Sequence, residues 1–236
     1  MLFRSRGTYT IIKTLAMNSR LEKIWHWEAS GEYEDYRGQG QHGLISADID
    51  GDGRDELVIG SAALDDDGAG MWTTGLGHPD VGYVGDMDPD RPGMEIFYGI
   101  EPRRKSKGLA MADARTGELI WSYDGPTTHV HSQGMAGDID PDHPGVEFYA
   151  GESDRSQFWL YAASGERLSD KPFGDNVLAP RAIWWDDDPQ KEIECEGRIF
   201  DYKGDTIDEI EGKVIGIGDV LGDWREEIIT SLDGEI

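Results

Sequence analysis

Short apolar runs alternate along this chain with loops that are rich in glycine or in acidic residues. No window longer than ten residues keeps the i, i+3, i+4, i+7 spacing of an amphipathic helix without an intervening Gly or Pro. The apolar runs are strand-sized, and the 32 Gly and 10 Pro supply turns between them. The pattern therefore predicts an all-β chain.

An acidic loop with D-x-D-x-D spacing precedes each of the clearest apolar runs. The loops cover residues 48–56, 86–95 and 138–147, and the runs 57–59, 96–98 and 148–149 follow them. Weaker copies begin at Asp186, where Gln190 replaces the third acid, and at Asp219, where Leu221 replaces the middle one. Successive first aspartates lie 38, 52, 48 and 33 residues apart. These intervals match a propeller blade of four strands, which takes about 40–50 residues.

A second repeat, a strand–turn–strand hairpin with a central glycine, lies between the acidic loops. Its clearest copy is 114–121, looser copies are 163–166 and 201–205, and 21–27 resembles the returning strand of an earlier unit. We expect a β-propeller with calcium-binding loops between strands, present as an incomplete set of about four to five blades. The chain then forms a single partial domain, 1–236, with units that begin near residues 42, 78, 130, 180 and 214.

Such an array starts and stops abruptly, whereas a closed propeller leaves few open strand edges. We therefore expect that the remainder of the propeller is missing from this chain, and that the chain alone associates through its open edges. Residues 1–17 lack the continuous apolar core of a secretory signal.

Charge narrows the set of partners. The formal net charge is −26, from 48 acidic and 22 basic residues. A chain this acidic repels nucleic acid and anionic membranes, so we expect neither as a partner. It also repels an acidic polysaccharide unless bound cations reverse the local field. Eight Trp, nine Tyr and six Phe argue against disorder, and the single Cys195 excludes an internal disulfide.

The acidic loops suit a hard cation. Alternate carboxylates of a turned loop can point at one centre, and calcium accepts six to eight oxygens in loose geometry. An EF-hand is excluded, because position 12 counted from Asp48 is Ile59 and strands flank the loop. The alternative is that the aspartates cap turns through their own backbone. We expect several Ca²⁺ ions, held by Asp48, Asp50, Asp52 and Glu56, by Asp86, Asp88, Asp90 and Glu95, and by Asp138, Asp140, Asp142 and Glu147.

Two histidines occupy matching places in neighbouring units. His42 and His78 each lie beside glycine and ahead of an acidic-loop strand. Equivalent positions of adjacent blades approach each other around a propeller axis, so we expect both rings at one site, outside the core. The alternative is a turn histidine bonded to a carboxylate. His129 and His131 alternate and so face one side of a strand or loop.

The two tryptophan pairs at 25/27 and 184/185 allow either core packing or a sugar platform.

The order of these segments resembles the rhamnogalacturonan lyases of polysaccharide lyase family 11. The resemblance is carried by residues 6–10, 38–42, 47–56, 61–68, 75–80, 85–95 and 184–188. It implies a large, secreted or periplasmic, calcium-binding β-propeller with further blades before and after this segment. It also implies an enzyme that cleaves pectic rhamnogalacturonan, an acidic polysaccharide, by β-elimination.

β-Elimination removes the C5 proton of a uronic acid and expels the sugar linked at C4. The neighbouring carboxylate must be neutralised by a calcium ion or an arginine, and a neutral histidine suits the base. Our candidates for base and helper are His42 and His78. Tyr83 is the candidate that protonates the leaving oxygen, and Arg181 the candidate that holds the carboxylate.

Two other functions stay open. The family pattern has asparagine at Gln41 and histidines near Tyr83 and Ile100, so this chain departs from it. One alternative is a non-catalytic, calcium-stabilised propeller of the adhesin type that binds sugar or protein. The other is a lyase for a different uronic-acid polymer, such as ulvan.

Overall fold

The computed structural model describes residues 2–6, 9–131, 134–175, 180–232 and 234. The predicted all-β class is confirmed, and one short 3-10 helix, η1 (Gly31–Tyr36), interrupts the strands. The chain divides into two compact units, Met1–Ser132 and Gln133–Ile236. Among the described residues, no helix has the length and apolar character needed to cross a membrane.

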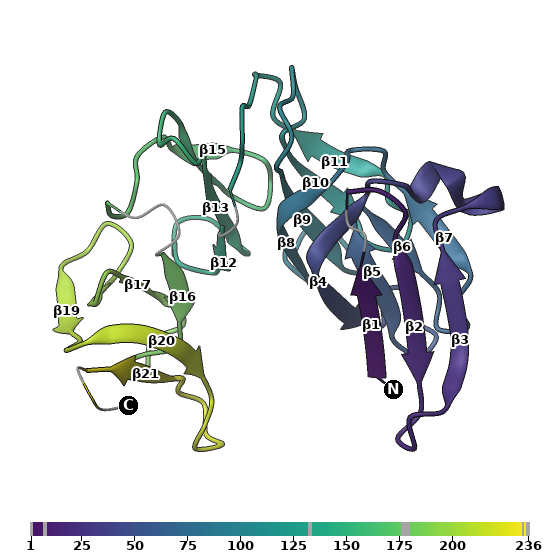
Figure 1. Cartoon of the computed structure of the whole chain (residues 1–236). Helices are drawn as coiled ribbons and strands as arrows, with labels where there is room; N and C mark the ends of the chain where they lie inside the picture. The colour runs from purple at the N-terminus through teal and green to yellow at the C-terminus, as the bar shows by residue number, and fades with distance from the viewer. Residues whose placement is uncertain (1, 7–8, 132–133, 176–179, 233, 235–236) are drawn as a thin grey trace. The chain divides into compact units, whose positions relative to one another are not determined.

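The first unit contains three antiparallel sheets of consecutive strands, which can be followed in Figure 1. The sheet at the N-terminus has three strands, and the next two sheets have four each. Their strands are β1 (Leu2–Arg6), β2 (Lys13–Met17) and β3 (Lys23–Glu28); β4 (Gly40–Ala47), β5 (Glu56–Gly60), β6 (Ala62–Leu64) and β7 (Gly70–Thr73); and β8 (Pro79–Gly85), β9 (Glu95–Ile100), β10 (Leu109–Asp113) and β11 (Leu119–Ser122).

The second unit repeats the arrangement with two four-stranded sheets and a two-stranded one. Its strands are β12 (Met135–Gly137), β13 (Glu147–Gly151), β14 (Phe158–Tyr161) and β15 (Arg167–Ser169); β16 (Arg181–Ile183), β17 (Glu192–Cys195), β18 (Arg198–Phe200) and β19 (Thr206–Glu209); and β20 (Lys213–Gly218) and β21 (Glu227–Ser231).

The second strand of each four-stranded sheet is buried at every position, and in β5, β9 and β13 this burial explains the apolar run. In β5, Val58 packs into one core cluster with Ile96 and Tyr98. Its neighbours Leu57 and Ile59 face the other side, in a second cluster. Because successive side chains of a strand point to opposite faces, one strand joins two cores.

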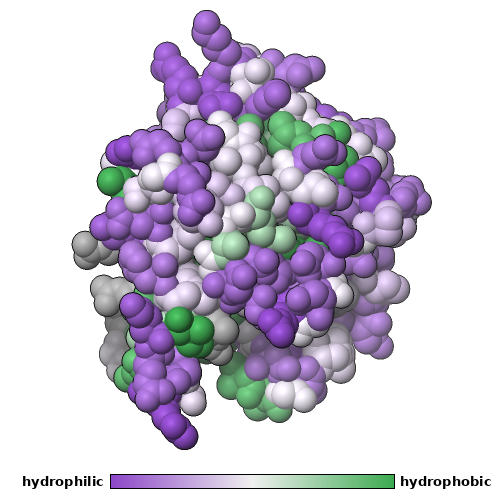
Figure 2. All heavy atoms as spheres, turned by 90° about the vertical axis from the view of Figure 1, so that its right-hand side faces the viewer, coloured by the Kyte–Doolittle hydropathy of each residue, from purple (hydrophilic) through white to green (hydrophobic). Residues whose placement is uncertain are grey.

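The N-terminal sheet closes one of these cores with aromatic residues. Trp27 is 3% exposed and lies against Tyr33 and Tyr36 of η1, with ring centroids 5.4 and 5.3 Å away. Trp27 is therefore a core residue rather than part of a sugar platform. The face of the molecule in Figure 2 is mostly hydrophilic, with small separate apolar patches.

Candidate functional site

Two neighbouring sheets of the first unit bring His42 and His78 together. His42 lies in β4 and His78 immediately precedes β8, and these two strands are in contact. The ring centroids are 4.8 Å apart, with an interplanar angle of 78°. The matching places of the two histidines in their units thus bring them to one site.

His78 is fixed from both sides of its ring. It is 1% exposed, so the expectation that neither histidine belongs to the core is wrong for this residue. Its Nδ1 atom hydrogen-bonds the carbonyl oxygen of Gly40, and its Nε2 atom lies 3.2 Å from Asp80 Oδ1 and 3.3 Å from Glu101 Oε2. Because a carbonyl only accepts, Nδ1 carries hydrogen, while Nε2 faces two carboxylates.

These surroundings favour the imidazolium form of His78. Burial opposes the charge, but the hydrogen bonds to Asp80 and Gly40 and the charges of Asp80 and Glu101 outweigh it and raise the pKa of His78 above its ordinary value. His78 therefore holds its proton more tightly than an ordinary imidazole, which makes it less suited to the role of a neutral base.

His42 is the accessible member of the pair. Its side chain is 63% exposed, and its Nε2 atom lies 3.5 Å from Asp80 Oδ1. Asp80 itself is nearly buried on its side chain, so its Oδ1 atom bridges the two histidines. His42 can reach a bound molecule with one ring nitrogen.

Tyr9 is a member of the site that the sequence analysis did not identify. Its hydroxyl lies 3.3 Å from His42 Nε2, and its ring centroid is 4.3 Å from that of His78. Partial burial, a hydrogen bond to Glu101 and the charges of Glu101 and Asp80 raise the pKa of Tyr9. The hydroxyl therefore keeps its proton at neutral pH. Tyr9 lies in one of the segments that carry the family resemblance, but it is distant in sequence from both histidines.

Glu101 extends the cluster to the second pair of histidines. Its Oε1 atom lies 3.2 Å from His129 Nε2, and the rings of His129 and His131 have centroids 5.1 Å apart. The sequence analysis missed Glu101, because a single carboxylate after an apolar run has no distinctive pattern.

Two sets of ligand-type side chains overlap here. The first set is His42, His78 and Asp80, and the second is Asp80, His129 and His131. Within each set, one ligand atom from each residue lies within 4.8 Å of the others. Each set could hold a divalent cation.

The other two candidates are Tyr83 and Arg181. Tyr83 is in β8, three residues beyond Asp80, which corresponds to about 10 Å along a strand. Burial raises its pKa to about 12. Arg181 belongs to the second unit, where its Nη1 atom lies 3.7 Å from Glu194 Oε2.

All five acidic loops share a glutamate that opens the following strand and holds the loop. In the first loop, Glu56 Oε2 accepts hydrogen bonds from the backbone N–H groups of Ile49 and Asp50, at 2.9 and 3.3 Å. Glu95, Glu147, Glu192 and Glu227 each accept two equivalent bonds from their own loops. This clamp orients the loop backbone against the sheet.

The clamp also corrects the register of the fourth loop. Glu192 accepts from Trp185 and Asp186, so Asp186 corresponds to Asp50, and Trp184 stands where the first loop has Asp48. The first acid of this loop is therefore missing. Asp201, from the turn between β18 and β19, joins the carboxylates of Asp186, Asp188 and Glu192.

The aspartates do cap turns, as the alternative interpretation expected. Asp48 accepts hydrogen bonds from the N–H groups of Gly51 and Gly53, and Asp50 accepts from Asp52. Capping leaves room for a cation in the first loop, because ligand atoms of Asp48, Asp50 and Glu56 lie within 4.8 Å of one another. Loop 184–192 shows the same convergence, with Asp201 added. Among the described residues, loops 86–95 and 138–147 do not.

Buried carboxylate oxygens in the two convergent loops fit a bound cation. Oε1 of Glu56 and Oε1 of Glu192 are buried without a hydrogen-bond partner among the described residues. Burial raises the pKa of both carboxyl groups, against the effect of their backbone hydrogen bonds. A calcium ion bound by these oxygens would remove this cost.

Together these features define an all-β chain of repeated antiparallel sheets with clamped acidic loops and a histidine–carboxylate–tyrosine cluster. The family described as rhamnogalacturonan lyase family 11, C-terminal domain, matches residues 1–235, and the chain belongs to that family. The expected family is thus confirmed.

Known relatives agree with this assignment. The chain is 39% identical over 248 residues to rhamnogalacturonan endolyase YesW of Bacillus subtilis (strain 168), covering 97% of this chain and 38% of YesW. It is 36% identical over 258 residues to rhamnogalacturonan exolyase YesX of the same organism, covering 97% of this chain and 41% of YesX. The crystal structure of YesW matches with a TM-score of 0.85 and 35% identity, over 99% of this chain and 41% of that one. The chain thus spans well under half of the relatives it matches.

Proposed function

We propose that this chain forms part of a polysaccharide lyase that cleaves a pectic rhamnogalacturonan-type polymer by β-elimination. The observation that supports the proposal is the cluster of His42, His78, Asp80 and Tyr9, which unites an exposed histidine, a buried histidine beside a carboxylate, and a hydroxyl. The relatives named as rhamnogalacturonan endolyase and exolyase support the substrate class.

The reaction assigns one task to each side chain. The imidazole of His42 takes the proton from C5 of the uronic acid, and the released electron pair forms the double bond between C4 and C5. The bond between C4 and the glycosidic oxygen breaks, and the Tyr9 hydroxyl gives its proton to that oxygen. His78 and its carboxylates fix the ring of His42, and the imidazolium offsets the negative charge that develops on the uronate.

Tyr9 takes the role that the sequence suggested for Tyr83. Its hydroxyl is within hydrogen-bond reach of the proposed base, whereas Tyr83 lies three residues beyond Asp80 in β8. A donor beside the base can transfer its proton within one bound sugar linkage.

We also propose that the consecutive four-stranded sheets are blades of a β-propeller. The repeated antiparallel order and the glutamate clamp, present in five loops, support one recurring unit. A polymer too large to enter a cell requires a secreted or periplasmic protein, in keeping with this substrate.

Calcium is proposed at loops 48–56 and 184–192, where carboxylate oxygens converge. Bound there, it would supply positive charge that stiffens the loops and offsets part of the net charge of −26.

An absorbance assay for the unsaturated product tests the proposed function. The protein that contains these residues is incubated with rhamnogalacturonan, with ulvan and with homogalacturonan. Product from rhamnogalacturonan alone is expected. Product from ulvan alone would assign another lyase activity, and binding without product would assign a non-catalytic sugar-binding propeller.

A further inference from the structure

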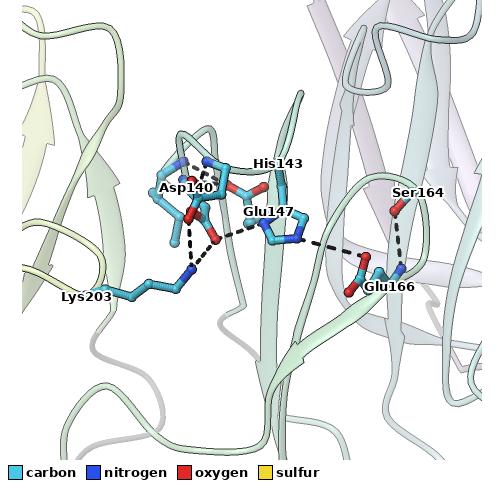
Figure 3. Close-up of polar contacts among 8 residues, drawn as sticks. Asp140, His143, Glu147, Ser164, Glu166 and Lys203 are labelled. Carbon is cyan, nitrogen blue, oxygen red and sulfur yellow. Dashed lines mark hydrogen bonds and ion pairs between the residues drawn. The ribbon is translucent and has the colours of Figure 1, made fainter.

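The third acidic loop already contains a cation supplied by the protein. Lys203 lies in the turn between β18 and β19, and its Nζ atom reaches Asp140 Oδ2 at 2.9 Å. The same ammonium is 3.7 Å from Asp142 Oδ2. The Asp140 side chain is 1% exposed and that of Lys203 is 54% exposed, so the ammonium approaches a buried carboxylate from the solvent side. Figure 3 shows the lysine side chain extended toward the Asp140 carboxylate.

Asp140 also accepts hydrogen bonds from other groups. His143 approaches from the other side, with Nδ1 3.0 Å from the same Oδ2 atom, as Figure 3 shows. The Oδ1 atom accepts the backbone N–H of Asp142 at 3.2 Å. Both oxygens of the carboxylate that corresponds to Asp50 are therefore engaged.

The first loop lacks this feature. Among the described residues, Asp48 and Asp50 form no ion pair with a basic side chain, and their oxygens converge with Glu56. Among the described residues, Glu147 Oε1 and Glu56 Oε1 are both buried without a hydrogen-bond partner, so this feature is common to the two loops. The loops differ in the lysine ammonium group, which, in the part of the chain that the structure describes, only loop 138–147 has beside its aspartates.

One turn serves two loops with opposite charges. Asp201 points its carboxylate toward Asp186 and Asp188, which adds an acidic ligand to loop 184–192. Two residues later, Lys203 adds positive charge to loop 138–147. The turn thus favours a cation in one loop and disfavours it in the other.

We propose that Lys203 replaces a divalent cation in loop 138–147, so that this loop binds none while Lys203 is present. This inference rests on the proposed calcium binding in one respect: the other acidic loops are taken to hold the ions with which loop 138–147 is compared. Calcium ligands lie at about 2.3–2.6 Å from the ion, so an ion on Asp140 Oδ2 would come close to the ammonium and be repelled by it. The expectation of a calcium ion at Asp138, Asp140, Asp142 and Glu147 is revised accordingly.

Counting bound ions tests the proposal. The chain is stripped with a chelator, equilibrated with calcium and analysed for metal per chain, together with isothermal titration. Lys203→Met keeps much of the side-chain volume and removes the charge, and we expect it to bind one more ion than the wild type. Lys213→Met is the matched control. It removes an exposed lysine of β20, in the same unit but outside the acidic loops, and should leave the count unchanged.

A second variant keeps the test decisive if Lys203→Met fails to fold. Asp140→Asn preserves the shape of the side chain and should leave the wild-type count unchanged. A loss of one ion in Asp140→Asn, or no gain in a folded Lys203→Met, would overturn the proposal. A wild type that binds no calcium would instead refute calcium at the other loops. A gain of one ion in Lys203→Met would still support the role of Lys203.

Discussion

His42 and His78 lie edge to face with centroids 4.8 Å apart, yet their surroundings differ sharply. The side chain of His42 is 63% exposed, whereas that of His78 is 1% exposed and faces an acceptor at each ring nitrogen. Two histidines in matching places of adjacent sheets therefore have different tasks. One is open to a substrate, and the other holds charge and position.

Substitution of the exposed His42 should affect turnover and leave stability nearly unchanged. We expect His42→Ala to lower kcat by about 10²–10⁴-fold, the usual contribution of a positioned acid or base. Tm should change little, because the ring packs into no core. Steady-state assays and thermal melts measure both. An active His42→Ala would remove this residue from the mechanism.

The buried histidine should make stability depend on pH. The pKa of His78 is raised in the folded chain, so the folded state binds the proton more tightly than the unfolded state. This stabilisation is fully present below the unfolded pKa, about 6.5, and is lost as pH rises through the folded pKa. The difference in unfolding free energy between wild type and His78→Gln should therefore shrink as pH rises. Urea denaturation across this pH range, with chelator present, measures the difference in unfolding free energy. A difference that grows with pH would contradict a raised pKa of His78.

A pair of tyrosine variants separates the two candidate proton donors. Tyr9→Phe removes a hydroxyl 3.3 Å from His42 Nε2 and should lower kcat with little effect on KM. Tyr83→Phe removes the hydroxyl of a residue three positions beyond Asp80 in β8 and should leave kcat near wild type. The reverse pattern would return the donor role to Tyr83.

The strands and the meeting of two histidines were predictable, because apolar runs and repeat spacing are local signals. The composition of the site was only partly predictable. Asp80 and Glu101 act through geometry, since Asp80 bridges both histidine rings and Glu101 joins His78 to His129. In a chain with 48 acidic residues, the sequence around a single carboxylate does not indicate that it belongs to a site.

The burial of His78 and the register of the fourth acidic loop could not be predicted from the sequence either. Nothing next to His78 in sequence indicates that Gly40 and Glu101 enclose its ring. In the fourth loop, the aspartates alone suggested that Asp186 was the first acid. Only the hydrogen bonds of Glu192 show that Asp186 is equivalent to Asp50.

Calcium should raise the melting temperature of the chain, since binding to the folded state alone stabilises it. We expect Asp50→Ala to reduce this increase, because Asp50 is one of three side chains whose oxygens converge in the first loop. Asp35→Ala, an exposed acid in η1, is the control for net charge and should keep the full increase. Melts of chelator-stripped protein with and without added calcium provide the comparison, and equal increases in both variants would exclude the first loop.

Glu56 should reveal the two tasks of the clamp separately. Its Oε2 atom accepts two backbone hydrogen bonds, and its buried Oε1 atom has no hydrogen-bond partner among the described residues. Glu56→Gln keeps an oxygen that can accept both bonds but removes the charge that a cation needs. We therefore expect its metal-free stability to stay close to wild type while its response to calcium falls. Glu56→Ala removes the acceptor as well and leaves the buried N–H of Ile49 unsatisfied, at about 1–3 kcal/mol, together with the partly buried N–H of Asp50. It should lose both the metal-free stability and the response. Chemical denaturation with chelator and with calcium resolves the two effects, and a Glu56→Gln variant with an undiminished calcium response would show that the carboxylate only clamps the loop.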